Sequence, residues 1–358
     1  MTEPRFLRAY AQIVLTLGVC LCAACTSADP NSTDNPDASA EPVACPDVAD
    51  GGLPEDVFCT GLYRDRDASK YRAEALPYTP GVTFWSDGAE KQRYLFLPPG
   101  STIDIADLDA WTFPVGTKAW KEFRFEGKLV ETRLFWKVGA KNWSAGTYVW
   151  DAAQQSAKLN TARTPTLLAN GYEIPTAKDC GKCHHGASDY LLGVEAVELA
   201  LPTARGVTLA GLAAAGALSR PLTDTSISLP EDDTGKAANA LGYLHANCGL
   251  PCHSSRGLGH ETELIMRLSA GEFWTEKGLQ IPDVTATDTY QATVAREPTT
   301  ASVAQKYPGA FRITPGAHEK SLVWQLAHIR GQYQMPPLVS HAVDEQGTQK
   351  LAEWIDAL

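Results

Sequence analysis

The sequence predicts a mixed α+β fold, in which an N-terminal antiparallel β domain is followed by a mostly α-helical region. Between residues 71 and 168, apolar and polar side chains alternate with a period of two, and turns such as Pro98-Pro99-Gly100 separate the runs. This pattern is typical of antiparallel strands. After Lys178 the composition changes to Ala, Leu and Gly, and apolar residues recur three and four positions apart, as they do in helices.

The alternation places strands at residues 94–97, 121–125, 132–137 and 147–150. The same β region holds six of the nine tryptophans, which are Trp85, Trp111, Trp120, Trp136, Trp143 and Trp150. We interpret them as core and interface residues, because a small sheet needs large side chains to close its core. A carbohydrate-stacking surface is the alternative.

Two helices are expected in the C-terminal third. Residues 234–247 form an amphipathic pattern that runs into Cys248, and residues 343–358 carry a stripe of Leu351, Trp354, Ile355 and Leu358. These helices bracket a segment expected to form one domain, residues 234–358. The β domain is expected at 71–168 and a separate segment at 169–233.

The N-terminus predicts export. Arg5 and Arg8 precede an apolar run of about 12 residues, which fits a signal peptide over residues 1–24 better than a membrane span. The run ends in CAAC, which resembles a bacterial lipobox, so Cys25 is the expected lipidation site; cleavage by an ordinary secretory signal is the alternative. Residues 25–70 are expected to form a lipidated flexible stalk and linker. A periplasmic or outer-membrane lipoprotein follows, attached to the membrane through lipid only.

The charge balance disfavours two kinds of partner. The 358 residues include 31 basic and 42 acidic side chains, a net charge of −11. This is the wrong sign for a protein whose main partner is nucleic acid or an anionic membrane surface.

The nine cysteines divide into groups with different expected fates. Cys20 and Cys22 leave with the signal peptide and Cys25 takes lipid. Cys45 and Cys59 can form a disulfide in an oxidising compartment. The remaining four form two local pairs.

The first pair lies in Cys180-Gly181-Lys182-Cys183-His184, the pattern of c-type haem attachment. In that chemistry two thiols bond the haem vinyl groups and the adjacent imidazole, here His184, ligates the iron. A redox dithiol and half of a zinc site are the alternative interpretations.

The second pair, Cys248 and Cys252, also precedes a histidine, His253, but three residues separate the cysteines instead of two. We predict a second haem here. A local disulfide, or a zinc site shared by all four cysteines, is the alternative.

Met335 is the expected distal ligand of the second haem. It lies in Gln334-Met335-Pro336-Pro337, just before the terminal helix, and a thioether on a Pro-stiffened loop is suited to face iron opposite a histidine. Packing is the alternative role. For the first haem the sequence offers His185, His245, His260 and Met266 without choosing among them.

Residues 241–358 resemble a class I c-type cytochrome domain, and residues from about 75 to 358 resemble bacterial dihaem c-type cytochrome-like lipoproteins. The resemblance is carried by FWSDGAEKQRYLFLPPG, FPVGTKAWKEF, ETRLFW, CGKCH, LHANC, RITPG, QMPPL and LAEWI. It implies covalently bound haem and electron transfer in the periplasm or at the outer membrane. We expect two haem c groups, a redox protein partner and an electron carrier more than a catalyst, so no catalytic residue is assigned. A dihaem peroxidase, and a non-redox surface binding lipoprotein with disulfides, are the alternatives.

Overall fold

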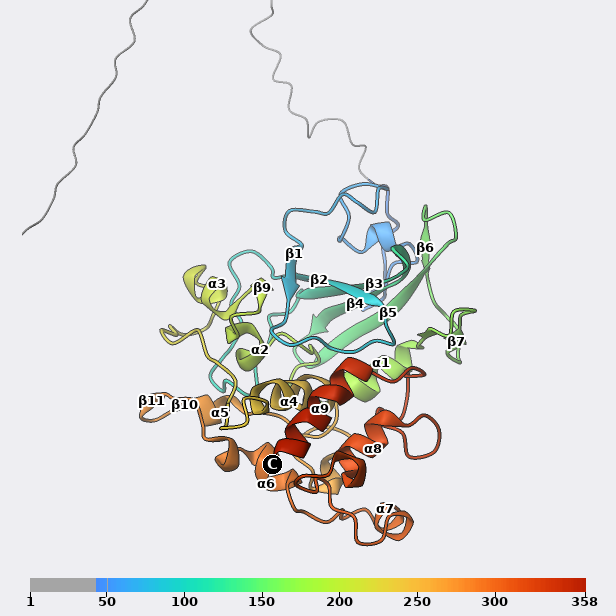
Figure 1. Ribbon diagram of the computed structural model, residues 1–358. Coiled ribbons are helices and arrows are strands. Elements are labelled where there is room, and N and C mark those ends of the chain that lie inside the picture. Colours follow the sequence, from blue (N-terminus) through green and yellow to red (C-terminus); the bar gives the residue numbers. More distant parts are fainter. Residues whose placement is uncertain (1–42, 50) are drawn as a thin grey trace, which may run out of the picture. The chain divides into compact units, whose positions relative to one another are not determined.

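Seven strands form the main sheet of the computed structural model, which describes residues 43–49 and 51–358 (Figure 1). Every neighbouring pair in the sheet is antiparallel, and the strand order is β6-β5-β4-β3-β2-β1-β9. The strands are β1 (Leu76–Thr79), β2 (Glu90–Phe96), β3 (Lys118–Phe125), β4 (Lys128–Gly139), β5 (Asn142–Trp150), β6 (Ala157–Leu159) and β9 (Arg205–Gly206). The predicted α+β class and the predicted antiparallel sheet are therefore confirmed.

The two faces of the sheet follow from the period-two alternation along the central strands. Tyr94, Trp120 and Leu134 are paired across β2, β3 and β4 and point to one face, whereas their neighbours Leu95, Ala119 and Phe135 point to the other. All six are buried. Because both faces carry core residues, the sheet has to be covered on both sides.

The N-terminal segment covers the first of these faces. A short 3₁₀ helix, η1 (Val57–Cys59), and the residues after it bury Val57, Phe58, Leu62 and Tyr63 in one cluster with Trp120. The flexible linker expected up to residue 70 is therefore wrong for this stretch. Its apolar side chains remove the exposed face of the sheet from water, which composition alone did not indicate.

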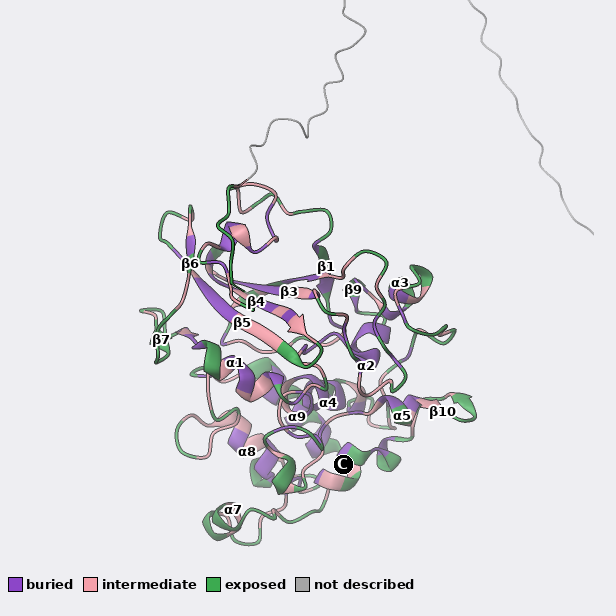
Figure 2. Ribbon diagram, turned by 180° about the vertical axis from the view of Figure 1, so that it is seen from behind, coloured by how far each residue is buried: buried purple, intermediate pink, exposed green. Residues whose placement is uncertain are grey.

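Helices cover the second face, on the side of the sheet opposite the N-terminal segment (Figure 1). The α-helices are α1 (Ala177–His184), α2 (Ala196–Ala200), α3 (Leu209–Ala214), α4 (Ala237–Leu244), α5 (Ala270–Phe273), α6 (Asp288–Thr293), α7 (Ala301–Lys306), α8 (Leu322–His328) and α9 (Glu345–Ala357). A π-helical turn, η2 (His245–Gly249), continues α4, and the remaining 3₁₀ helices are η3 (His260–Thr262), η4 (Val284–Ala286) and η5 (His318–Lys320). Two small hairpins pair β7 (Thr166–Leu167) with β8 (Glu173–Ile174) and β10 (Trp274–Thr275) with β11 (Gly278–Leu279). Seen from behind, α2, α4 and the central strands are largely buried, whereas α7 and the β10 hairpin are exposed (Figure 2).

The two helices expected in the C-terminal third pack against each other. A Cβ at Gly347 in α9 would overlap the ring of Tyr243 in α4, so a glycine is needed at this close approach. Leu351, Trp354 and Ile355 are buried, as the predicted stripe requires. Helix α4 begins at Ala237, three residues later than expected, because Gly235 has a φ of +65° and turns the chain before it.

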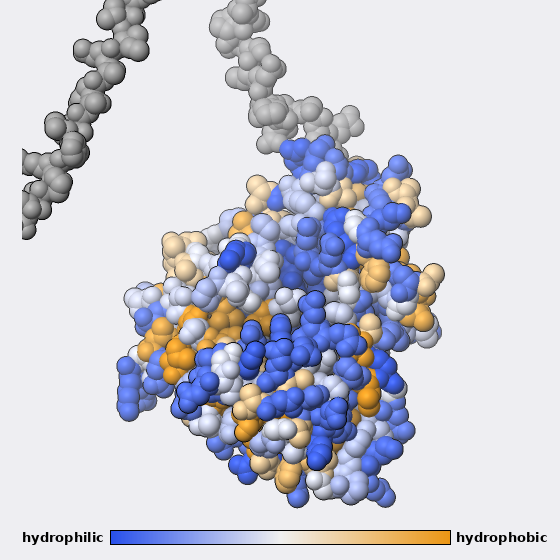
Figure 3. All heavy atoms as spheres, viewed as in Figure 1, coloured by the Kyte–Doolittle hydropathy of each residue, from blue (hydrophilic) through white to orange (hydrophobic). Residues whose placement is uncertain are grey.

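One hydrophobic cluster spans residues from the sheet and from the helices, including Leu95, Phe135, Leu241 and Trp354. Strand β9, which lies in the 169–233 segment, also joins the edge of the main sheet. The structure therefore packs the three expected segments around shared residues, and their boundaries stay predictions. On the face seen in Figure 3, hydrophobic residues gather in a patch at the left, between the level of the sheet and the lower helices.

Candidate haem site

The first Cys-His motif lies within helix α1. Thr176 and Asp179 form a capping box at the start of this helix, which satisfies free backbone N–H groups and fixes where the helix begins. Cys180, Cys183 and His184 follow at steps of three and four residues, so they lie on one side of the helix. All three line the same cavity.

The imidazole of His184 is held by a hydrogen bond and a ring contact. Its Nδ1 lies 2.5 Å from the carbonyl oxygen of Tyr190, and its ring stacks on Phe135 with the centroids 4.1 Å apart. Since a carbonyl only accepts, Nδ1 carries the proton and Nε2 is left as a lone-pair donor. Burial, with the nearby charge of Lys121, lowers the pKa of His184 well below its usual range. A neutral imidazole oriented by a carbonyl is the form that ligates a metal.

The second motif begins in the π turn that continues α4. Two hydrogen bonds span five residues, from the Leu250 N–H to the His245 carbonyl at 2.8 Å and from the His253 N–H to the Cys248 carbonyl at 2.8 Å. A π turn holds one more residue than an α turn. The extra residue between Cys248 and Cys252 is thus accommodated by locally widened turns.

His253 is buried at the end of this turn, and burial beside Arg312 lowers its pKa to about 4. Its Nδ1 lies 3.4 Å from the Thr262 hydroxyl. Like His184, it lines the cavity and is neutral at physiological pH.

The two motifs meet in one place, although 64 residues separate Cys183 from Cys248. Cys180, Cys183, His184, Cys248, Cys252 and His253 all line a single cavity of about 300 Å³. The thiols of Cys183 and Cys252 are hydrogen-bonded, which lowers the pKa of Cys183 to about 7. A Cβ at Gly186 would press on the carbonyl oxygen of Pro251, so a glycine lets the end of the first motif touch the second.

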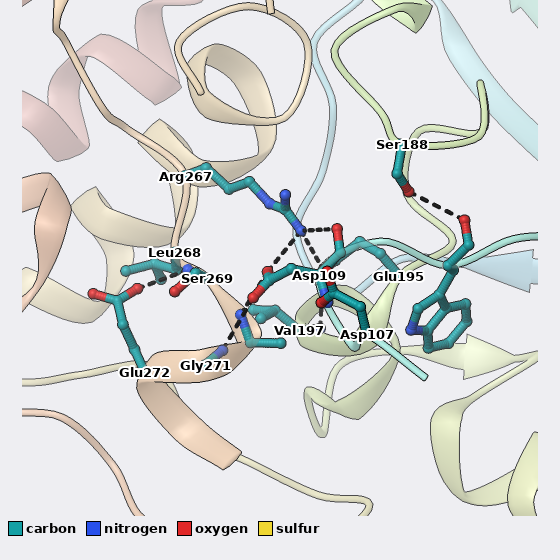
Figure 4. Close-up of polar contacts among 12 residues, drawn as sticks. Asp107, Asp109, Ser188, Glu195, Val197, Arg267, Leu268, Ser269, Gly271 and Glu272 are labelled. Atoms are coloured by element: carbon teal, nitrogen blue, oxygen red, sulfur yellow. Dashed lines mark hydrogen bonds and ion pairs between the residues drawn. The ribbon is translucent and has the colours of Figure 1, made fainter. Parts of the chain in front are cut away.

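Met266 and Met335 both line the cavity as well. Met335 is half-buried, and its N–H donates to the Leu326 carbonyl at 2.7 Å, which ties the predicted ligand loop to α8. Met266 is buried, and its N–H donates to the carbonyl of His253 at 2.9 Å. The segment after Met266 is fixed by Asp109, which accepts from Arg267 at 2.8 Å (Figure 4).

The three other candidate ligands of the first haem do not line the cavity in the described part of the chain. His185 and His260 are exposed. His245 is buried but accepts the Leu268 N–H at Nδ1 and turns Nε2 toward Glu195, at 3.5 Å, and Glu198, at 3.8 Å. Of the four candidates, only Met266 is placed in the cavity wall.

The alternative roles of the cysteines, in a disulfide or in a zinc site, can be recognised from their geometry. Cys180, Cys183, Cys248 and Cys252 are free in the structure. No group of three or more His, Cys, Asp or Glu side chains that could hold a metal ion occurs among residues 43–49 and 51–358. Cys45 and Cys59 form a disulfide, with their Cα atoms 5.5 Å apart.

The predicted signal peptide and Cys25, the predicted lipidation site, lie outside the described residues. No helix in the described ranges is long and apolar enough to cross a membrane.

The sheet contributes a set of residues to the cavity that the sequence analysis missed. Lys91, Arg93, Lys121 and Arg133, from β2, β3 and β4, all line it. Burial and the neighbouring cations lower the pKa of Lys121 to about 7. A signal was present in the sequence: these basic residues have the same strand parity as Leu95 and Phe135, so alternation places them on a covered face.

In comparisons with known proteins, no family model, no curated protein and no solved structure matches the chain.

Proposed function

We propose that the protein is an exported c-type cytochrome, which carries two covalently bound haems and transfers single electrons in the periplasm or at the outer membrane. The observation that carries this proposal is the convergence of both Cys-His motifs on one cavity. Nothing in the spacing of a sequence requires two motifs so far apart to face each other. Two haem-binding motifs that share a cavity put their cofactors within reach of each other for electron transfer.

The residues present fit haem c in their chemistry. Each motif supplies two free thiols and one buried imidazole, and the Nδ1–H of His184 is already committed to a backbone carbonyl. When bound, the haem iron supplies the one-electron couple. The protein would set its potential through axial ligands, burial and nearby charge.

The finer assignment of the C-terminal third is part of the proposal. A class I cytochrome c region within residues 234–358 is supported by the packing of α4 on α9 and by the position of Met335 in the cavity wall. His253 and Met335 would be the axial ligands of the second haem. His184 would be the proximal ligand of the first.

Export and lipidation at Cys25 belong to the same proposal and rest on the sequence of residues 1–25. Export also agrees with covalent haem attachment and with the Cys45–Cys59 disulfide, because both need an extracytoplasmic compartment.

A dihaem peroxidase is the second candidate function. It is favoured by the absence of His185, His245 and His260 from the cavity lining in the described chain, since a first haem without a distal imidazole could bind peroxide. Turnover of hydrogen peroxide by the reduced protein would support it. The electron carrier predicts no turnover above that of free haem peptides.

The experiment that tests the proposal is production of the full chain with a haem maturation system, followed by a reduced-minus-oxidised spectrum and intact mass. Wild-type protein is expected to carry two haems. Cys180→Ala with Cys183→Ala, and separately Cys248→Ala with Cys252→Ala, should each remove one. A wild-type chain without covalent haem would refute the proposal.

A further inference from the structure

Three basic side chains form a row across the sheet where it faces the cavity. Arg93 in β2 is paired with Lys121 in β3, and Lys121 is paired with Arg133 in β4. Directly opposed residues on antiparallel strands point to the same face, and all three line the cavity. Like charges in this register repel one another, so the row requires compensating negative charge.

Only Arg133 in the row has a hydrogen-bonded carboxylate partner; Arg93 feels the charge of Glu198, with which it forms no hydrogen bond and whose pKa burial raises well above its usual range. The Arg133 guanidinium forms a bidentate pair with Glu131, with Nε 3.0 Å from Oε2. Arg93 and Lys121 are 7% and 9% exposed, and each contacts an aromatic ring: Arg93 lies 5.6 Å from the Phe84 centroid and Lys121 lies 5.4 Å from the Phe135 centroid. In the described part of the chain, neither has a hydrogen bond or ion pair.

The acidic residues of the cavity do not supply the missing charge, because each is engaged elsewhere. Asp87 accepts from Ser340 and the His341 N–H, and Glu173 pairs with His341. Asp179 pairs with Lys182, and Asp344 caps α9. Arg93 and Lys121 thus face the cavity without a hydrogen-bonded carboxylate, and burying a charge without such a partner is strongly unfavourable.

We propose that Arg93 and Lys121 bind the propionate carboxylates of a haem held in this cavity, so that the sheet is part of the haem site. This inference rests on the proposed function, because it takes the ligand to be covalently attached haem. A porphyrin fixed by thioether bonds brings its own two carboxylates into the cavity and cannot diffuse out. Its negative charge compensates the two cations.

The sheet would then have a role that an ordinary small cytochrome domain lacks. Residues before the first motif would set the electrostatic environment of the haem, and the motif-bearing helices alone would not reproduce it. A free carboxylate or inorganic anion would satisfy the same two cations. The experiment therefore has to separate an anion carried by haem from one that exchanges with solvent.

The test uses holoprotein of four kinds: wild type, Lys121→Gln with Arg93→Gln, the charge-conserving Lys121→Arg with Arg93→Lys, and Arg124→Gln as control. Arg124 is on β3 with Lys121 but on the opposite face, where it pairs with Glu122 at 3.5 Å. Intact mass first counts the haems in each protein. The reduction potential of each haem is then measured from pH 5 to 8, with and without acetate at constant ionic strength.

Removal of the two cations should stabilise ferric over ferrous haem at the nearer site. We expect a change of roughly tenfold in that equilibrium, on the order of 59 mV downward for a one-electron couple. The potential should also become pH-dependent, because carboxylates without cationic partners regain protons in this range. The charge-conserving variant should restore the wild-type values, and Arg124→Gln should leave them unchanged. Should Lys121→Gln with Arg93→Gln fail to fold, Lys121→Gln alone is compared in the same way.

Two results would overturn this inference alone. In the first, Lys121→Gln with Arg93→Gln retains both haems but has the same reduction potentials and pH dependence as Arg124→Gln. In the second, acetate has a saturable effect on the potentials of the wild type, and Lys121→Gln with Arg93→Gln loses that effect. The second result would assign the cations to an exchangeable anion. A wild-type protein with no covalent haem would overturn the proposed function and this inference together.

Discussion

Substitution of Phe135 should separate the stability of the sheet from the environment of His184, the proposed ligand of the first haem. Phe135 is fully buried in β4, and its ring stacks on His184 at 4.1 Å. Its neighbour Leu134 is equally buried but points to the other face of the sheet, into the cluster around Trp120. The two adjacent residues therefore provide a matched pair, only one of which touches the proposed ligand.

Both substitutions to Ala remove a fully buried side chain. We expect Phe135→Ala to lower the free energy of unfolding by about 3–5 kcal/mol and Leu134→Ala by about 2–5 kcal/mol. Urea denaturation followed by circular dichroism measures both losses.

The effect on His184 should differ between the two variants. Burial is the main cause of the lowered pKa of His184, and without the Phe135 ring water can solvate the protonated imidazole. Protons should then displace the iron from His184 at a higher pH. We expect the midpoint of acid-induced ligand loss to rise by on the order of one pH unit in Phe135→Ala, equivalent to ~1.4 kcal/mol. Leu134→Ala should leave this midpoint unchanged.

An acid titration of the haem absorption spectrum provides the assay. An equal shift in both variants would mean that general destabilisation, and not the ring contact, controls the ligand. No shift in Phe135→Ala would refute the reasoning, provided that the variant retains both haems.

Four further outcomes are expected. Met335→Ala should abolish the weak far-red band of thioether-ligated ferric haem and lower the potential of that haem, with both haems still attached; a retained band would make Met335 a packing residue. Cys45→Ser with Cys59→Ser should lower the free energy of unfolding by roughly 3 kcal/mol, because the bridge closes a loop of the unfolded chain; unchanged denaturation would contradict this. Burial raises the pKa of Glu198 well above 4.5, so the wild type should lose stability as the pH rises from 4.5 toward the folded-state pKa. Glu198→Gln should flatten this pH dependence. A wild-type stability curve without that decline would exclude the effect. Cys25→Ser should release the protein from membranes, and unchanged partition in a fractionation assay would remove lipidation from the proposal.

Local patterns predicted much of the fold. Alternation placed the central strands, because each of them buries side chains on a face set by period two, as Trp120 and Leu134 show. The apolar stripe of the last helix was equally local: Leu351 and Trp354 are buried as expected.

The features that were missed depend on contacts distant in sequence. Val57 and Phe58 are core residues because the sheet needs a cover on that side, and nothing near them in the chain indicates it. The pairing of β9 with β1 joins segments more than 120 residues apart. Such pairings are set by the whole fold and not by local composition.

The candidate site divides in the same way. Cys180, Cys183 and His184 were identifiable because they have the spacing typical of covalent haem attachment, and the second Cys-His motif departs from it by one residue. The roles of Arg93 and Lys121 were not, since a charged residue in a strand is usually solvent-exposed. Only the assembled sheet shows that these two basic residues face a cavity without a hydrogen-bonded carboxylate.

The measurement that tests the central claim most directly is the intact mass of the mature wild-type protein, made in cells with haem maturation machinery and denatured in acid before analysis. Thioether-bound haem survives denaturation, so each attached group adds its full mass to the chain. The proposed function predicts two haem increments, one lost with each pair of Cys→Ala substitutions. A mass that corresponds to the polypeptide alone, with or without a lipid anchor, would contradict it.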